Sequence, residues 1–294
     1  MAFGVLALAW GTSFLFIKVA VQTLQPITLV SLRLLVGLLG LLLVMRWQGE
    51  RLPRGWTVWR HLAVMGLMNV AVPFVLITWA ESGETGLDSG VASVLNSTVP
   101  FFSVLISGLI LQAEVVGAGM IAGLLVGFAG VVLLVGPNLG GDWGGFLPYL
   151  AVLVAALGYA ASSAYARRYL RGLRPVVLSA GQLMVADSAV IVAALLFEDW
   201  RQQSLPLATI GALLWLGLLG SCLAYILYFF VLQSWGATRA TLVTYLLPIV
   251  GVSAGALVLG EVVDWRLLVG GLLILSGVGA VNSKRSLRKP RPGT

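Results

Sequence analysis

One residue pattern occurs twice in this chain, about half a chain apart. In both copies an alanine is followed at set intervals by a proline, a glutamate and two glycines, and only the proline-to-glutamate interval differs, by one residue. The copies are Ala92, Pro100, Glu114, Gly123, Gly130 and Ala240, Pro248, Glu261, Gly270, Gly277. The pattern predicts a duplicated unit, and internal duplication in an apolar chain is typical of transporters.

The composition excludes an ordinary soluble fold. Hydrophobic residues make up 59% of the 294 residues, charged residues make up only 10%, and the mean hydropathy is +1.00. Soluble domains have about a quarter of their residues charged, and no soluble surface could hide this much apolar area. The sequence therefore predicts an integral membrane protein. The first residues enter a full-length span without a basic segment or cleavage site, so we expect no cleaved signal peptide.

Several kinds of chemistry lack the residues they need. Cys222 is the only cysteine and His61 the only histidine, which argues against a Cys/His metal site or a histidine-based triad. The sequence also has no phosphate-binding loop of the G-x-x-x-x-G-K-[ST] type. We therefore expect no metal, no cofactor and no enzyme activity. A membrane-embedded transferase is a remote alternative, because such an enzyme needs clustered Asp or His residues near a membrane face and none are present.

Ten stretches are long and apolar enough to cross a bilayer, which takes about 20 mostly apolar residues. They are residues 2–21, 28–47, 60–80, 89–111, 115–135, 145–165, 176–197, 207–232, 238–259 and 265–283. The connections between them are short. The predicted fold class is therefore all-α, an integral membrane bundle of ten transmembrane helices.

Basic residues indicate how the spans are oriented. Arginines cluster between spans 2 and 3 and between spans 6 and 7, and five further basic residues follow span 10. With ten spans, these segments and the N-terminus lie on one side, and the loops on the other side carry mainly acidic residues. The positive-inside rule places both termini in the cytoplasm, for a chain in the cytoplasmic (inner) membrane. The net charge of +7 thus reflects topology, and we expect no nucleic-acid partner.

The duplication extends over the whole chain. Trp10 corresponds to Tyr159 and Pro26 to Pro175, both at an offset of 149 residues. Each unit holds five spans, and an odd number of spans turns the second unit upside down relative to the first. We predict a first repeat over residues 1–138, an inverted second repeat over 139–283, and a basic tail over 284–294. Inverted repeats place the substrate site near the bilayer midplane, between the two units.

Spans 4 and 9 carry matching stripes of small and polar residues. The stripes are Ser93, Asn96, Pro100, Ser103, Ser107 and Thr241, Thr244, Pro248, Gly251, Gly255. Steps of three and four residues keep each stripe on one helix face. Polar residues in spans face the bundle interior or water, so we expect these faces to line a cavity. Tight helix packing is the alternative. Pro100 and Pro248 free a carbonyl one turn back, and we expect them to act in gating.

Aromatic and polar side chains elsewhere in the spans suggest the rest of the cavity. Rings can stack on an apolar or aromatic substrate while hydroxyls and amides fix its polar end. The predicted substrate-binding residues, with Asn96, are Trp10, Ser13, Asn69, Trp79, Tyr159, Ser163, Tyr225, Tyr228 and Tyr245. Trp79 lies near a span end, where an interfacial role is the alternative. Tyr225 and Tyr228 could instead pack against lipid or neighbouring helices.

Glycines on spans 5 and 10 suggest a different role. Gly119, Gly123 and Gly127 recur every four residues, and Gly271 and Gly279 flank Leu275 in a similar register. Such spacing is typical of closely packed membrane helices. We expect spans 5 and 10 to brace each other away from the cavity.

Two charges lie clearly inside spans, Arg33 in span 2 and Asp187 in span 7. Intramembrane charges are functional candidates by default, so both are candidates for a proton or charge relay. A structural ion pair or snorkelling is the alternative. Glu114 and Glu261 follow spans 4 and 9, and we expect each to cap or orient the next helix.

The chain resembles the EamA-type branch of the drug/metabolite transporter superfamily. The resemblance rests on the Trp10–Phe14 segment WGTSF, on Leu32-Arg33 after Pro26, and on the duplicated blocks. It implies two inverted five-helix repeats, alternating access and export of small metabolites. The chain is most similar to the amino-acid exporters, including those for aromatic amino acids. It departs from the pattern in the second repeat, where Tyr159 replaces the common tryptophan and Gln182 corresponds to Arg33.

The predicted function is thus secondary export of amino acids and related small metabolites through a central cavity. The expected partners are a small-molecule substrate and the lipid bilayer, for a monomer or homodimer. A drug, nucleobase or sugar-type transporter of the same superfamily is the alternative, because a cavity rich in Asn and Tyr suits those ligands as well.

Overall fold

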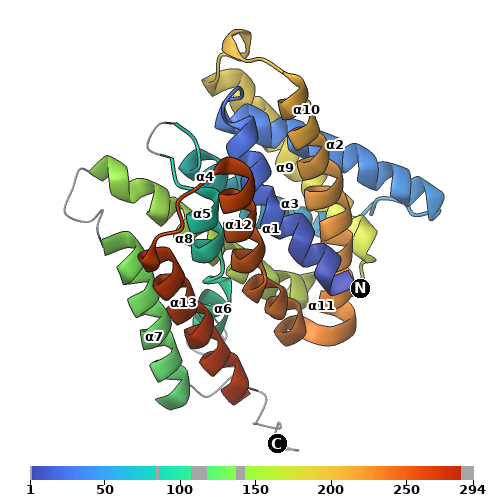
Figure 1. The fold of residues 1–294 in the computed structure, drawn as a ribbon. Helices are drawn as coiled ribbons and strands as arrows, with labels where there is room; N and C mark the ends of the chain where they lie inside the picture. The colour runs from blue at the N-terminus through green and yellow to red at the C-terminus, as the bar shows by residue number, and fades with distance from the viewer. Residues whose placement is uncertain (1, 84–85, 107–117, 137–142, 286–294) are drawn as a thin grey trace, which may run out of the picture.

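The apolar stretches fold into helices, the element that pairs its own backbone groups without help from water. The computed structural model describes residues 2–83, 86–106, 118–136 and 143–285, and this part of the chain contains no strand (Figure 1). The α-helices are α1 (Ala2–Ala20), α2 (Pro26–Trp47), α3 (Trp56–Gly66), α4 (Val72–Ala80), α5 (Ser89–Asn96), α6 (Val99–Leu105), α7 (Ala118–Val135), α8 (Trp143–Tyr169), α9 (Pro175–Phe197), α10 (Leu207–Leu214), α11 (Ala224–Thr241), α12 (Leu247–Ala254) and α13 (Trp265–Arg285). The short elements are η1 (Leu67–Ala71), η4 (Trp200–Gln202), η5 (Trp215–Leu223), η6 (Leu242–Tyr245) and η7 (Gly255–Leu259).

These elements join into the ten helices that the sequence predicts. Six described helices are long and apolar enough to cross a membrane: Phe3–Ala20, Pro26–Trp47, Trp56–Ala80, Gly145–Tyr169, Pro175–Phe197 and Leu207–Ser234. Four shorter apolar helices complete the set: Ser89–Leu105, Ile121–Val135, Val243–Leu259 and Trp265–Ala280. The all-α, ten-helix prediction is confirmed. Several helix boundaries differ from the prediction, most of all at span 8, where α11 runs to Thr241 beyond the predicted end at residue 232.

The helix of span 2 begins at a proline and is capped from across the bundle. Pro26 opens α2, where its missing N–H costs nothing because the first-turn N–H groups have no helical acceptor. The carboxylate of Glu198, at the end of α9, accepts hydrogen bonds from the backbone N–H groups of Ile27 (2.8 Å) and Thr28 (2.6 Å). A carboxylate at a helix N-terminus satisfies these donors and the helix dipole together.

Glu261 caps a helix of the other half of the chain. Its carboxylate accepts from the Ser89 N–H and hydroxyl (2.8 and 2.9 Å) and from the Gly90 N–H (3.0 Å), at the start of α5. The expectation that Glu261 orients the next helix is therefore wrong. Asp264 caps that helix instead, since its carboxylate accepts from the Leu267 N–H near the start of α13 (2.8 Å). Glu114 lies outside the described residues.

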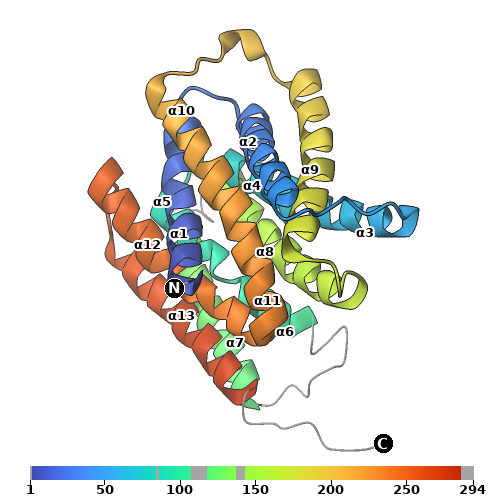
Figure 2. The same cartoon turned by 90° about the vertical axis from the view of Figure 1, so that its right-hand side faces the viewer.

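Helices α7 and α13 pack backbone to backbone along a seam of glycines. Both views place them side by side at one edge of the bundle (Figures 1 and 2). The glycines in contact are Gly123, Gly127 and Gly130 on α7 and Gly270 and Gly277 on α13. A Cβ added to Gly130 would lie 2.6 Å from the carbonyl oxygen of Gly270, so a side chain there would force the helices apart. Close packing is as expected, but the register is not: Gly271 faces Val94, and Gly279 has open space around it.

Helices that occupy the same place in each repeat also pack on each other. Contacts join α2 to α9 and α5 to α12, just as they join α7 to α13. In addition, α1 packs on η5 and α12, while α8, its counterpart, packs on η1 and α6. This crossed pattern is what a two-fold relation between the repeats would produce. The exact repeat boundaries stay a prediction.

Candidate functional site

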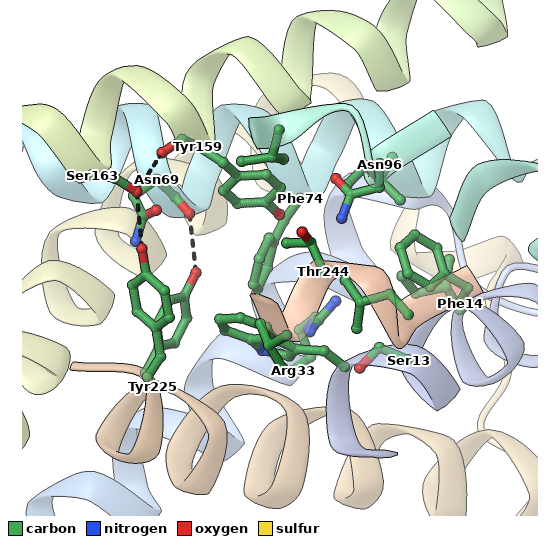
Figure 3. A pocket seen from close by; sticks show the side chains of 17 residues that line it. Ser13, Phe14, Arg33, Asn69, Phe74, Asn96, Tyr159, Ser163, Tyr225 and Thr244 are labelled. Atoms are coloured by element: carbon green, nitrogen blue, oxygen red, sulfur yellow. Dashed lines mark hydrogen bonds between the residues drawn. The ribbon is translucent and has the colours of Figure 1, made fainter. Parts of the chain in front are cut away.

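A cavity lies in the middle of the bundle and is lined by helices from both halves of the chain (Figure 3). It offers about 100 Å³ to the centres of water-sized spheres. Its walls come from α1, α2, η1, α4, α5, α6, α8, α11, η6 and α12. Six of the predicted spans (1, 3, 4, 6, 8 and 9) contribute to it, and span 2 adds a single residue, Arg33.

Most of the predicted substrate-binding residues line this one cavity. They are Trp10, Ser13, Asn69, Asn96, Tyr159, Ser163, Tyr225 and Tyr228. Trp79 does not: its side chain is 43% exposed, because it follows the lining residue Ile77 by two positions, about 200° around the helix. Tyr245 does not line it either, although its neighbour Thr244 does. Whether the lining residues bind a substrate remains a prediction.

The helices of spans 4 and 9 are both broken beside the cavity. Span 4 was predicted as one helix but stops at Asn96 and restarts at Val99, with Pro100 in the first turn of α6. Span 9 begins with the 3₁₀ turn η6 and restarts at Leu247, with Pro248 in the first turn of α12. Proline lacks an N–H and cannot donate to the carbonyl four residues earlier, which belongs to Asn96 and Thr244 respectively. Both of these residues line the cavity.

The two polar stripes serve both of the roles that the sequence left open. Beyond the cavity they pack tightly, because a Cβ on Gly251 or Gly255 would collide with Ser93 or Ser89 of α5. At the breaks the stripes instead expose Asn96 and Thr244 to the cavity. Ser107 lies outside the described residues, and nothing is described of the Thr241 side chain.

A buried hydrogen-bond network centres on Asn69, which lies in the π-helical turn η1. Its amide nitrogen donates to Gln182 Oε1 (3.0 Å), and its amide oxygen accepts from Ser162 Oγ (2.8 Å). Its backbone carbonyl accepts from the Tyr225 hydroxyl (3.0 Å). The π turn widens the helix at this point, and such turns are frequent at functional sites. The network fixes Asn69 and Tyr225 as a rigid wall.

The aromatic rings beside this wall are also held in place. Trp10 Nε1 donates to the Gly220 carbonyl (3.1 Å), and the Trp10 ring lies against Tyr225 (centroids 6.0 Å apart, edge to face) and Tyr228 (5.2 Å). The hydroxyl groups of Tyr228 and Ser163 are hydrogen-bonded at 2.9 Å. These aromatic contacts leave little freedom to the rings, so the wall is formed before any ligand arrives.

Arg33 is buried on the cavity without a carboxylate beside it. The side chain is only 3% exposed, its guanidinium carbon lies 4.1 Å above the centroid of the Phe74 ring, and Nη2 lies 3.5 Å from Ser221 Oγ. Asp187, the other intramembrane charge, does not line the cavity and accepts a hydrogen bond from Ser31 (3.2 Å). The pairing of Arg33 with Asp187 that the sequence allowed is therefore absent from the described structure.

Sequence reasoning missed several apolar lining residues, including Phe74, Ile77 and Val99. Spacing gave no clear signal for Ile77, because in a regular helix it lies about 80° around the axis from Asn69, as far as Trp79 does on the other side. Phe74 could not be identified from spacing, because its position depends on the guanidinium that packs against it.

A second buried charge cluster lies beyond the cavity, where span 3 ends. Lys18 Nζ donates to the carbonyls of Glu81, Gly86 and Leu87 (3.2, 3.1 and 2.8 Å). The Glu81 carboxylate, just past the end of the span, is 1% exposed, and neither of its oxygens has a hydrogen-bond partner. Burial raises the pKa of Glu81 well above its usual range and Glu261 adds to the rise, while Lys18 and Arg33 oppose it.

Comparison with known proteins gives matches over nearly the whole chain. The model of the EamA-like transporter family matches residues 1–136 and 146–283. A protein of Archaeoglobus fulgidus named an uncharacterized transporter is 27% identical over 94% of this chain and 95% of its own length. The Escherichia coli (strain K12) protein YedA, named an uncharacterized inner membrane transporter, is 29% identical over 90% of this chain and 84% of its own.

Two further matches bear on function and on fold. A Salmonella typhimurium protein named a probable amino-acid metabolite efflux pump is 27% identical over 92% of this chain and 89% of its own length. A solved crystal structure matches with a TM-score of 0.69 and 22% identity, covering 98% of both chains. At that identity the similarity establishes the fold alone.

Proposed function

We propose that this chain, which belongs to the EamA-like transporter family, exports amino acids and related small metabolites by alternating access. Family membership makes it a multi-pass integral membrane transporter, and its relatives are named as transporters rather than enzymes. The substrate class, the direction of transport and the mechanism are the proposal.

The observation that carries the proposal is the position of the cavity, between two broken helices at equivalent places in the two repeats. Discontinuous helices at a repeat interface are where secondary transporters bind their substrates. The lining combines apolar surface with a few amide, hydroxyl and guanidinium groups, a combination typical of small-molecule sites. An amino-acid efflux pump among the similar proteins supports the same substrate class.

The breaks also supply a means of movement. Each proline separates a half-helix that borders the cavity from the rest of its span, so the halves can tilt without breaking a regular hydrogen-bond ladder. In the proposed cycle α5–α6 and α12 rock against each other and open the cavity to each side in turn. Pro100 and Pro248 are the gating positions.

The proposal places the protein in the cytoplasmic membrane with both termini inside, as the arginine-rich loops predict. YedA, a relative, is named as an inner membrane protein. The carrier acts as a monomer or a homodimer on a small-molecule substrate.

A second candidate within the same superfamily is a transporter of drugs, nucleobases or sugars. The observation in its favour is the neutral part of the lining, in which Asn96 and the tyrosines offer hydrogen bonds to uncharged polar ligands.

Counterflow in proteoliposomes tests the proposal. The purified protein is loaded with each of a panel of unlabelled amino acids, and uptake of labelled threonine, methionine and phenylalanine is followed. We expect saturable exchange that Trp10→Ala and Asn96→Ala lower by at least about tenfold. Trp79→Ala, the matched control with the same residue type outside the cavity, should stay within about twofold of wild type.

The contrary result is an absence of exchange with every amino acid in protein that is folded and inserted. That result would reject amino acids as substrates, and drugs, nucleobases and sugars would then be tested in the same vesicles.

A further inference from the structure

We propose that Arg33 binds a carboxylate of the substrate, so that the carrier selects carboxylate-bearing metabolites over their neutral or cationic analogues. This inference rests on the proposed function, because it names the chemical group by which the same cavity recognises its substrate.

Arg33 is a buried charge whose hydrogen-bonding capacity is largely unused. Its Nε has no hydrogen-bond partner, and its contact with Ser221 is long at 3.5 Å. A guanidinium has five N–H donors arranged to meet a carboxylate in pairs. A buried charge is costly unless it is paired and hydrogen-bonded, and here the face of the Phe74 ring and the distant Ser221 hydroxyl are its described contacts.

No carboxylate in the described part of the chain forms an ion pair with Arg33. Among the described residues the one ion pair joins Arg174 to Glu50, outside the cavity. The described lining contains no aspartate or glutamate. Glu81 contributes to the electrostatic environment of Arg33 but does not line the cavity. Within the described residues no carboxylate pairs with Arg33, and the carboxylate of a bound substrate would supply the missing partner.

The guanidinium of Arg33 shares its side of the cavity with other polar side chains. Figure 3 shows Arg33, Tyr159, Asn96 and Thr244 directed toward the same space. The Asn96 side chain is 7% exposed, and its amide oxygen has no hydrogen-bond partner. A ligand that carries a carboxylate and an amino group would satisfy both residues, the carboxylate at Arg33 and the amino group at the Asn96 oxygen. An apolar side chain would lie against Phe14 and Phe74.

The charge of the described lining also matches a carboxylate. Arg33 is the one charged side chain among the described residues that line the cavity, and Gln182, which corresponds to it in the second repeat, is neutral and hydrogen-bonded to Asn69. A single cation matches the single charge of a carboxylate. A phosphate monoester, close to doubly charged at neutral pH, would keep one charge unpaired in the same space.

Binding to the purified wild-type protein tests this without any transport. The probes are phenylalanine, 3-phenylpropionate, which keeps the carboxylate and lacks the amino group, and phenylalaninol, which lacks the carboxylate. Affinity is measured by the concentration dependence of thermal stabilisation. We expect both carboxylates to bind at least about tenfold more tightly than phenylalaninol. This factor corresponds to the smallest loss of affinity expected when a hydrogen bond to a charged group is removed. Equal binding of phenylalaninol and the carboxylates, or no binding of either carboxylate, would overturn the proposal.

Variants at position 33 assign the effect to the guanidinium. Arg33→Gln should weaken carboxylate binding roughly ten- to hundredfold and remove the discrimination against phenylalaninol. Arg33→Lys, which keeps the charge without the paired donors, should retain part of the discrimination. Arg46→Gln, at an exposed position of the same helix, is the matched control. Either Arg33 variant with wild-type affinities and full discrimination would overturn the assignment.

The two proposals fail separately. Amino-acid counterflow that persists unchanged in Arg33→Gln rejects the carboxylate site and keeps the exporter. Carboxylate binding that depends on Arg33, in a protein that exchanges no amino acid, keeps the site and rejects the amino-acid assignment.

Discussion

Two of the helix pairs that join the halves of this transporter carry small residues at intervals of three, four or seven positions. One pair is α7 and α13, which are continuous helices in contact along Gly123, Gly130, Gly270 and Gly277. The other is α5–α6 and α12, which are broken beside prolines and border a polar cavity. The residue spacing that indicates close packing in a sequence is therefore shared by a helix seam and by a cavity wall.

The difference lies in what accompanies the small residues. In the seam, glycine is required because backbone atoms of one helix touch the other, so the contact is rigid. At the cavity, a proline follows each break and an amide or hydroxyl precedes it. Broken helices give up hydrogen bonds that continuous helices keep, and in membranes this is tolerated where the backbone lines a cavity. We infer a rigid edge and a movable centre, and the following predictions test that contrast.

The largest expected effect is on the seam. Gly277→Leu places a side chain against the backbone of Gly123 and Gly127, which cannot move aside as a side chain could. We expect a loss of at least about 3 kcal/mol in stability or a failure to insert, measured by thermal unfolding in detergent. Gly279→Leu, on the same helix with open space around it, is the control. Equal losses for the two variants would contradict a specific seam.

The next effect separates two asparagines of the cavity wall. Asn69→Ala removes the partner of Gln182 and Ser162 and should cost about 2–4 kcal/mol, because buried polar groups lose their hydrogen bonds. Asn96→Ala removes no described side-chain hydrogen bond and should change stability by less than about 0.5 kcal/mol, although it should impair exchange. Unfolding curves of both variants measure the two stability losses. A larger loss for Asn96→Ala than for Asn69→Ala would show that the hydrogen-bond network is misassigned.

A smaller effect is expected at the breaks. Pro100→Ala and Pro248→Ala restore an N–H that can donate one turn back and straighten the helix. The maximal exchange rate should fall about tenfold, equivalent to a rise of about 1.4 kcal/mol in the activation barrier. The substrate concentration that gives the half-maximal rate should change little. Initial rates over a range of substrate concentrations separate the two parameters. A change in half-saturation alone would assign the prolines to binding rather than gating.

The smallest effect concerns Glu81, beyond the cavity. Its pKa is raised by burial, so the folded state holds the proton more tightly than the unfolded state does. The stability from Glu81 is then present below the unfolded pKa, about 4.3, and is lost as pH rises toward the folded value. Glu81→Gln should therefore gain stability relative to wild type as pH rises from 5 to 8. If the stability of Glu81→Gln relative to wild type instead falls over this pH range, the result would show that Lys18 holds the carboxylate ionised.

The sequence predicted most of the fold because lipid permits few alternatives. Ten apolar stretches became ten helices, and matching offsets brought together Trp10 and Tyr159, and Asn96 and Thr244, on one cavity. It failed where position depends on contacts between distant segments. Helix period alone could not separate Trp79 from Ile77 near the end of a span, and nothing local showed that Glu261 caps α5 or that Arg33 packs on Phe74.

The most direct test of the central claim is thiol modification of two single-cysteine variants during exchange. In a Cys222→Ala background, Val99→Cys places a thiol on the cavity wall, and Trp79→Cys places one at an exposed position of α4. The account predicts that modification of Val99→Cys abolishes exchange and that substrate slows the reaction. Modification of Trp79→Cys should leave exchange unchanged. The opposite result would contradict the cavity as the transport site: modification of Trp79→Cys abolishes exchange, and modification of Val99→Cys leaves it complete.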